Sequence, residues 1–301
     1  MRPRFPFVAV EAPAGRVEEL GVQLFELGAT GIEERAGRPG MATLVACFAS
    51  RARAERALGG LRQADGRVAA ELGEMVGDEW RDAYKKHFAP FALTETVTVA
   101  PPWAGYAARR AGEKVLVLDP GRAFGTGLHA STALVAEAME RRAPSLRGRR
   151  LLDVGTGSGI LALAGLLLGA KRAVGIDTDA AAIDVARENA AHSGLAARIK
   201  LRPAPIDAIR GRFGWVVANI EARVLVAMAE PLLRRVAPGG TLALSGILAQ
   251  ERAELLASFL GPGGRTAREG PRADFTLLET RRRGRGPEAW ATVVLRRRSP
   301  S

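Results

Sequence analysis

The run from Leu151 to Ile160, LLDVGTGSGI, constrains the fold of this chain more than any other feature. A short apolar strand leads into alternating glycines, and an apolar helix follows directly. Glycine adopts tight backbone angles and lets a ligand approach the main chain, while a helix start offers unpaired N–H groups. Ligands of open α/β sheets bind at the carboxyl ends of such strands. The run therefore predicts a site for a nucleoside-bearing cofactor on a Rossmann-like sheet.

The spacing of the glycines favours one cofactor class over another. A dinucleotide fingerprint that started at Gly155 would need a glycine where Ile160 stands. The sequence instead reads G-x-G-x-G, with Asp153 two residues before it, which is the form expected of class I methyltransferases. We therefore expect S-adenosyl-L-methionine, with Asp153 facing its amino-acid part through water, and we keep a nicotinamide oxidoreductase as an alternative. The cofactor-binding residues predicted from this run are Asp153, Gly155, Gly157 and Gly159.

A second acidic position follows the next predicted strand, residues 172–177. Asp177 ends that strand 22 residues after Gly155, where a carboxylate can accept hydrogen bonds from both ribose hydroxyls. This feature is shared with dinucleotide folds and does not separate the two cofactor classes. Asp179 is predicted to cap the helix of residues 180–191.

The order of predicted elements divides the chain into two kinds of architecture. Strands at 5–10, 32–34, 41–48 and 67–72 alternate with helices at 15–27 and 52–61, which is the order of a small ferredoxin-like α+β domain. From Leu151 onward strand, glycine turn and helix repeat, which predicts a doubly wound, mostly parallel sheet. The expected domains are a substrate-recognition domain over residues 1–75, a linker helix over 76–92 and a methyltransferase domain over 93–301.

Composition narrows the possible partners and compartments. The formal charge is +12, but 39 of the 44 basic residues are arginines scattered through the chain, which indicates compositional bias more than a nucleic-acid-binding device. We expect at most incidental contact with ribosomal RNA. The single Cys47 excludes an internal disulfide and a cysteine-rich metal site, and no metal is expected. The longest apolar run has eleven residues, fewer than the roughly 20 that span a bilayer, so we expect a cytoplasmic protein without a membrane partner.

Three further segments carry a resemblance to a known family. Residues 118–132, LDPGRAFGTGLHAST, follow the pattern D-P-G-x-A-F-G-T-G-x-H-x-T-T, with Ser131 in place of the first threonine of the pair. Residues 216–220 (VVANI) and 243–248 (ALSGIL) end the fourth and fifth predicted strands of the sheet. In these segments the chain resembles the ribosomal protein L11 methyltransferases, which methylate amino groups of that large-subunit protein. The resemblance is weakest over residues 1–75.

The resemblance implies a class I methyltransferase domain with a mostly parallel seven-stranded sheet, and it implies roles for particular residues. Asn219, on the loop after the fourth strand, would orient the acceptor amine, and the loop of Phe124 and Gly125 would cover the cofactor. His129 is interpreted as ordering that loop. The tail Ile220-Glu221-Ala222 replaces the usual Pro-Pro-aromatic and so disfavours a nucleic-acid base as acceptor. The cofactor-binding residues implied are Phe124, Gly125, Thr132, Gly155, Asp177 and Asn219.

The acceptor expected from the resemblance is lysine and amino-terminal amines of protein L11, free or on the large subunit. The sequence leaves open a methyltransferase of another protein lysine, of RNA or of a small molecule. It also leaves open a non-catalytic, ribosome-associated module that binds the cofactor. No dedicated catalytic base is expected, because desolvation of a lysine side chain favours its neutral, nucleophilic form.

Overall fold

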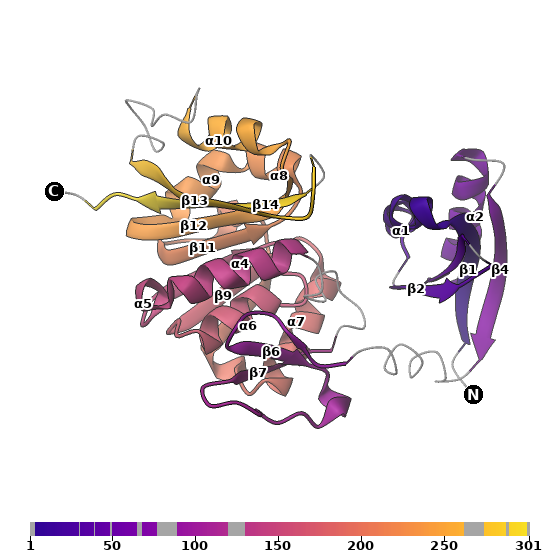
Figure 1. The fold of residues 1–301 in the computed structure, drawn as a ribbon, viewed down its shortest axis with the longest axis horizontal. Helices are drawn as coiled ribbons and strands as arrows, with labels where there is room; N and C mark the ends of the chain where they lie inside the picture. The colour runs from indigo at the N-terminus through magenta and orange to yellow at the C-terminus, as the bar shows by residue number, and fades with distance from the viewer. Residues whose placement is uncertain are drawn as a thin grey trace. The chain divides into compact units, whose positions relative to one another are not determined.

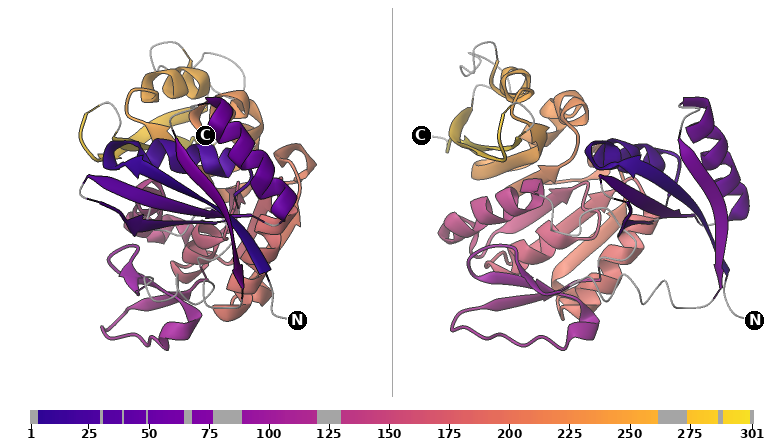
Figure 2. Two further views of the ribbon diagram at one scale, coloured as in Figure 1. Left: turned by 90° about the vertical axis from the view of Figure 1, so that its right-hand side faces the viewer. Right: turned by 45° about the vertical axis from the view of Figure 1, so that its right-hand side comes forward.

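The computed structural model of the chain describes residues 4–29, 31–38, 40–48, 50–64, 68–76, 89–119, 130–261, 274–286 and 289–299. Two compact units make up the chain, residues 1–88 and residues 89–301, and each is described by itself. Figure 1 shows both units from one side, and Figure 2 shows them from two more. Most of the predicted linker helix, residues 77–88, lies outside the described residues.

The smaller unit is a four-stranded antiparallel sheet with two helices. Its strands lie in the order β2-β3-β1-β4. Val8 and Val10 on β1 point to one face of the sheet, where they pack with Leu20, Leu24 and Leu61 of the helices. The βαββαβ order predicted from the sequence is confirmed. The elements are β1 (Arg4–Pro13), η1 (Ala14–Arg16), α1 (Val17–Glu26), β2 (Gly31–Ala36), β3 (Met41–Cys47), α2 (Arg51–Ala64) and β4 (Ala69–Val76).

The larger unit is built on a seven-stranded sheet in the order β10-β9-β8-β11-β12-β14-β13. The pairs from β10 to β12 are parallel, and β14 lies antiparallel to both β12 and β13. The mostly parallel seven-stranded sheet predicted from the sequence is thus confirmed. The strands are β8 (Arg150–Val154), β9 (Arg172–Asp177), β10 (Ile199–Pro203), β11 (Phe213–Asn219), β12 (Val236–Leu248), β13 (Phe275–Arg283) and β14 (Trp290–Arg297).

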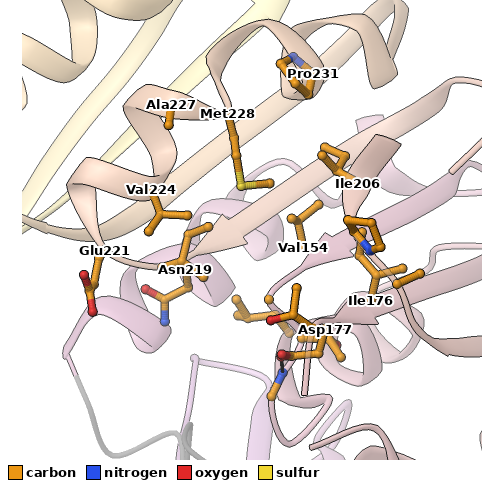
Figure 3. Close-up of a pocket in the computed structure, with 18 of the residues that line it drawn as sticks. Val154, Ile176, Asp177, Ile206, Asn219, Glu221, Val224, Ala227, Met228 and Pro231 are labelled. Carbon is orange, nitrogen blue, oxygen red and sulfur yellow. Dashed lines mark hydrogen bonds between the residues drawn. The ribbon is translucent and has the colours of Figure 1, made fainter. Parts of the chain in front are cut away.

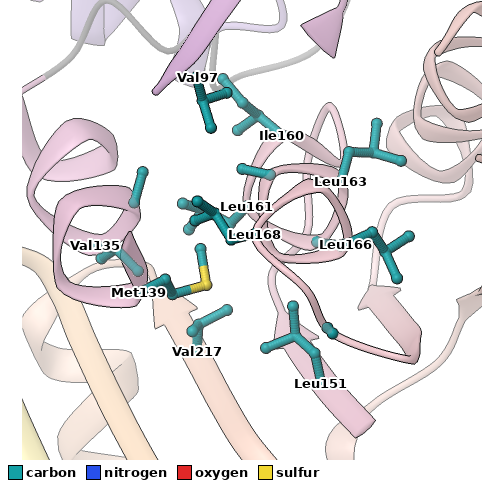
Figure 4. Close-up of a cluster of buried hydrophobic side chains, with 14 of the residues drawn as sticks. Val97, Val135, Met139, Leu151, Ile160, Leu161, Leu163, Leu166, Leu168 and Val217 are labelled. Carbon is teal, nitrogen blue, oxygen red and sulfur yellow. The ribbon is translucent and has the colours of Figure 1, made fainter. Parts of the chain in front are cut away.

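Helices cover both faces of this sheet, which explains why its central strands read as continuous apolar runs. Leu151 and Val217 face a cluster with α4 and α6, whereas Leu152 and Val216 face a cluster with α8, α9 and α10. Figure 4 shows Met139 of α4 beside Leu151 and Val217 in the first cluster. The helices of this unit are α4 (Ala130–Arg141), α5 (Ala143–Leu146), α6 (Ile160–Leu167), α7 (Ala180–His192), α8 (Ala222–Ala227), α9 (Ala229–Arg235) and α10 (Arg252–Leu260), with 3-10 turns η2 (Pro102–Ala104), η3 (Ala196–Arg198) and η4 (Ile206–Ala208).

A small three-stranded sheet precedes the large sheet in the sequence and is linked to α4 by hydrogen bonds. It consists of β5 (Phe91–Ala92), β6 (Val97–Ala100) and β7 (Lys114–Val117). The carboxylate of Glu140 on α4 accepts hydrogen bonds from the Thr94 hydroxyl at 2.6 Å and from the Thr96 backbone N–H at 2.8 Å. These bonds hold the small sheet against the helix that also carries Thr132.

Within the described ranges, no helix is both long enough and apolar enough to cross a membrane.

Candidate functional site

A cavity of about 620 Å³ opens at the carboxyl ends of β8, β9, β10 and β11. Figure 3 shows Asn219 and Glu221 on one side of it and Ile176, Asp177 and Ile206 on the other. Parallel strands bring their carboxyl ends to one edge of a sheet, so residues far apart in the chain meet there. The predicted site residues that line this cavity are Thr132, Gly155, Gly157, Asp177 and Asn219.

The glycine turn between β8 and α6 lines the cavity at the carboxyl end of β8. The backbone N–H groups of Gly155 and Thr156 both donate to the carbonyl of Ile176 at 2.9 Å, which ties the turn to β9. Gly155 has a φ of +70°, in the left-handed region where glycine is favoured. Gly159 is not among the residues that line the cavity, and a Cβ on it would lie 3.2 Å from Cβ of Ala186, so the glycine lets the turn approach α7 closely.

Asp153 lies where the sequence did not place it. It was expected to face the amino-acid part of the cofactor, but it is 1% exposed and is not among the residues that line the cavity. Its Oδ2 accepts hydrogen bonds from the Thr156 hydroxyl at 2.7 Å and from the Ala162 N–H at 3.1 Å. The carboxylate therefore holds the glycine turn and the start of α6 together through Oδ2, while its buried Oδ1 has no hydrogen-bond partner among the described residues.

Burial raises the pKa of Asp153 to about 7, against the opposing hydrogen bond from Thr156. Since the folded-state pKa lies above the ordinary 3.8, stability from the protonated form is full below about pH 4 and is lost as the pH rises through about 7. From pH 5 to pH 8 the wild-type free energy of unfolding should fall by about 2–3 kcal/mol more than that of Asp153→Asn. Urea unfolding at both pH values measures the difference. An identical pH dependence of stability in the two proteins would contradict the raised pKa of Asp153.

Asp177 ends β9 with its carboxylate fixed at the edge of the cavity. Oδ2 accepts a hydrogen bond from the Gly157 N–H at 2.9 Å, and Oδ1 accepts one from the Asp179 N–H at 3.1 Å. Each carboxylate oxygen has a further lone pair, so this side chain can still accept bonds from two ligand hydroxyls. Asp179 caps α7 as predicted, since its Oδ1 accepts from the Ala181 N–H at 2.8 Å.

Asn219 is the last residue of β11, rather than part of the following loop, and it is bonded to a residue 87 positions away. Its Nδ2 donates to Oγ1 of Thr132 at 3.0 Å, and its buried Oδ1 has no hydrogen-bond partner among the described residues. Thr132 is 1% exposed and is the third residue of α4. The hydrogen bond to Thr132 fixes the orientation of the Asn219 amide, so that Oδ1 is left to accept a hydrogen bond from another donor.

Several cavity residues were not predicted from the sequence, although an acidic residue type could have indicated two of them. Asp207 follows β10 and Glu221 follows β11, at the same sheet edge as Asp177. Asp207 lies four residues after the end of β10 and Glu221 two residues after the end of β11, so acids within a few residues of a parallel strand's carboxyl end could have indicated both. The apolar side of the cavity includes Val224 on α8 and Met228 directly after that helix. No local sequence pattern indicates that these two residues face a ligand.

Asn189 also holds the site together without lining it. This fully buried side chain donates through Nδ2 to the carbonyl of Ser158 at 2.9 Å and accepts through Oδ1 from the Asp119 N–H at 2.8 Å. It thereby joins the glycine turn to the chain just before residue 120. Phe124, Gly125 and His129, which the sequence placed over the cofactor, lie outside the described residues. In the described part of the chain, no cluster of His, Cys, Asp and Glu could hold a metal ion.

The strand order, the glycine turn after the first parallel strand and the acid that ends the second define a class I methyltransferase. A family model described as "Ribosomal protein L11 methyltransferase (PrmA)" matches residues 23–264. The chain belongs to this family, which confirms the resemblance found in the sequence.

Relatives of known name agree with this assignment. A ribosomal protein L11 methyltransferase of Sorangium cellulosum is 52% identical over 98% of this chain and 97% of its own length. One of Geobacter metallireducens is 42% identical over 69% of this chain and 64% of its own. The crystal structure of a ribosomal protein L11 methylase from Lactobacillus delbrueckii subsp. bulgaricus aligns with a TM-score of 0.60 at 28% identity, covering 70% of this chain and all of that one.

Proposed function

We propose that this chain transfers methyl groups from S-adenosylmethionine to lysine and amino-terminal amines of ribosomal protein L11. Family membership and the names of the relatives support the reaction and the substrate. The observation that carries the proposal in the structure is the buried, unpartnered Oδ1 of Asn219. Asp153 Oδ1 and Arg235 Nε also lack a partner among the described residues, but only Asn219 lines the cavity. An orphaned buried acceptor is costly unless a ligand donor reaches it, and an amine nitrogen supplies such a donor.

The residues that line the cavity fit S-adenosylmethionine. The Asp177 carboxylate would hold the ribose hydroxyls, and the glycine turn at Gly155 lets the main chain approach the ligand without side-chain interference. Apolar residues at Ile176, Ile206 and Met228 offer a surface for the adenine ring. When bound, the cofactor supplies a methyl group on a positively charged sulfonium centre, and the protein mainly orients the two reactants.

The charges around the cavity favour a cationic acceptor over a phosphate-bearing one. Asp177, Asp207 and Glu221 line it, while no Lys, Arg or His does so among the described residues. Opposite charges attract a protonated lysine to this opening, and like charges oppose the phosphates of an RNA. Glu221 also forms an ion pair with Arg223 at 2.6 Å. Arg223 does not line the cavity, and its charge offsets part of the charge of Glu221. This balance favours protein amines over RNA as the acceptor class.

The acceptor must lose its proton before it can attack. A free lysine has a pKa of about 10.4 and is almost wholly protonated at neutral pH, whereas transfer into the cavity disfavours the charged form. The proton can leave to water as the amine enters. Asn219 Oδ1 would then accept a hydrogen bond from the neutral amine and direct its lone pair toward the methyl group. No side chain is needed as a strong base in this scheme.

The test is methyl transfer by the purified full chain. With isotopically labelled S-adenosylmethionine we expect label on L11 but not on ribosomal RNA, and mass spectrometry of L11 should show added masses of about 14 Da on lysine or amino-terminal peptides. Label on RNA alone would instead favour the RNA methyltransferase alternative. Binding of the cofactor without methyl transfer to any acceptor would instead favour the non-catalytic, cofactor-binding module.

We propose that the smaller unit, residues 1–88, binds the protein substrate. A chain that begins at Ala89 should still bind S-adenosylmethionine, because every described residue that lines the cavity belongs to residues 89–301. It should methylate L11 at least about 100-fold more slowly, since binding energy far from the reacting atoms is lost. The cofactor-induced rise in melting temperature reports that the shortened chain is folded. Efficient methylation by a folded shortened chain would contradict the role of this unit.

A further inference from the structure

Ile220 follows Asn219 and lies half buried between two glycines from different parts of the site. One of them is Gly155, which begins the turn after β8. A Cβ placed on Gly155 would lie only 2.4 Å from Cγ2 of Ile220, closer than real Cβ contacts allow. The γ2 methyl of Ile220 therefore fills the space that a side chain at position 155 would need, and it packs directly on the cofactor turn.

The second glycine, Gly246, holds the backbone of Ile220 from the side of β12. A Cβ on Gly246 would lie 2.5 Å from the carbonyl oxygen of Ile220 and 2.8 Å from its nitrogen. The pairing of β12 with β14 shifts register between Leu244 and Ile247, which places Gly246 in a bulge with a φ of +80°. The bulge is anchored because the hydroxyl of Ser245 donates to the carbonyl of Ala291 at 2.9 Å.

From these contacts we infer that Ile220 is a positioning residue, which sets the gap between Asn219 and the glycine turn. The inference rests on the proposed function, in which Asn219 holds the amine and the turn holds the cofactor. The turn carries no side chain at position 155, so the β-branched side chain of Ile220, which is stiff at χ1, defines the separation. A misplacement of about 1 Å between reacting groups can cost about 100-fold in rate, so this gap matters for turnover.

Two substitutions of Ile220 separate positioning from plain packing. Ile220→Val keeps both γ carbons, including the one against Gly155, and removes only the terminal methyl. Ile220→Leu keeps the number of carbons and removes the branch at Cβ. We expect Ile220→Val to lower the melting temperature by roughly 2–4 °C while its kcat and its Kd for S-adenosylmethionine stay within about twofold. We expect Ile220→Leu to raise that Kd several-fold and to lower kcat at least about tenfold, with KM for L11 unchanged.

A matched pair of glycine substitutions tests the contact with β12. Gly246 and Gly194 both have positive φ, at +80° and +67°, so alanine is strained at either position. A Cβ on Gly246 meets the backbone of Ile220, whereas one on Gly194 has nothing within 4 Å. Gly246→Ala should therefore lower kcat at least about tenfold. Gly194→Ala, which carries the same backbone strain without the contact, should leave kcat within about twofold and lower the melting temperature less.

The readouts distinguish this inference from the proposed function. Equal kcat and equal cofactor Kd in Ile220→Val and Ile220→Leu would overturn the positioning role, and so would equal kcat in the two glycine variants. If the wild-type chain bound S-adenosylmethionine but left L11 unmethylated, the proposed function would fail. In that case the cofactor Kd, measured by titration calorimetry, would decide for Ile220: weaker binding by Ile220→Leu alone supports the role, and equal binding refutes it.

Discussion

Replacing Asn219 by alanine should lower kcat for methylation of L11 by about 100-fold, with little change in melting temperature. The amide oxygen is the buried acceptor that awaits a donor, and its loss leaves the amine without an orienting partner at the end of β11. The Kd for S-adenosylmethionine should rise by less than about tenfold, the equivalent of one hydrogen bond. Steady-state kinetics with purified L11 and thermal unfolding of the same preparations give these quantities.

Variants of Thr132 provide the control, because its hydroxyl holds the amide nitrogen of Asn219 at 3.0 Å. Thr132→Val removes the hydroxyl at nearly constant shape, so the amide can turn and kcat should fall by about tenfold, the effect of about one hydrogen bond. Thr132→Ser keeps the hydroxyl and should stay within a few-fold of wild type. A folded Asn219→Ala protein with undiminished kcat would refute the role given to this residue.

The second large effect is expected on cofactor binding. Asp177→Ala should raise the Kd for S-adenosylmethionine at least about 100-fold, because two hydrogen bonds to a charged acceptor contribute about 1.5–3 kcal/mol each. The substitution also frees the N–H groups of Gly157 and Asp179, which now bond to this carboxylate. Calorimetric titration with the cofactor measures the change directly.

Asp184 on α7 offers a matched control for the loss of a negative charge. Its carboxylate is 70% exposed, pairs with Arg187 at 2.6 Å and does not line the cavity. Asp184→Ala should therefore leave the Kd within about twofold of wild type. If both aspartate variants weakened binding equally, a general charge effect would replace the ribose contact as the explanation. If Asp177→Ala bound the cofactor like wild type, the ribose role would be refuted.

Much of the fold followed from the sequence because it depends on local patterns. The apolar runs, the glycine turn and the alternation of strands and helices predicted the doubly wound sheet and the βαββαβ unit. Asp177 was predicted to end a strand, and the family resemblance placed Asn219 just after another. Because parallel strands end at one edge of a sheet, both could be assigned to one site. The unexpected part was the side-chain direction of Asp153, which depends on how α6 packs over the turn.

The sequence by itself determined the order of elements, the glycine turn and the family, since these depend on residue types at fixed spacings. Only the tertiary structure decided which atoms meet. The bond between Thr132 and Asn219 spans 87 residues, and Ile220 meets glycines from two other strand ends. Such contacts depend on how α4, β8 and β12 pack around the end of β11, and no local pattern specifies that packing. The motif from Leu151 to Ile160 therefore predicts a cofactor, while the packing around Asn219 and Ile220 places an acceptor beside it.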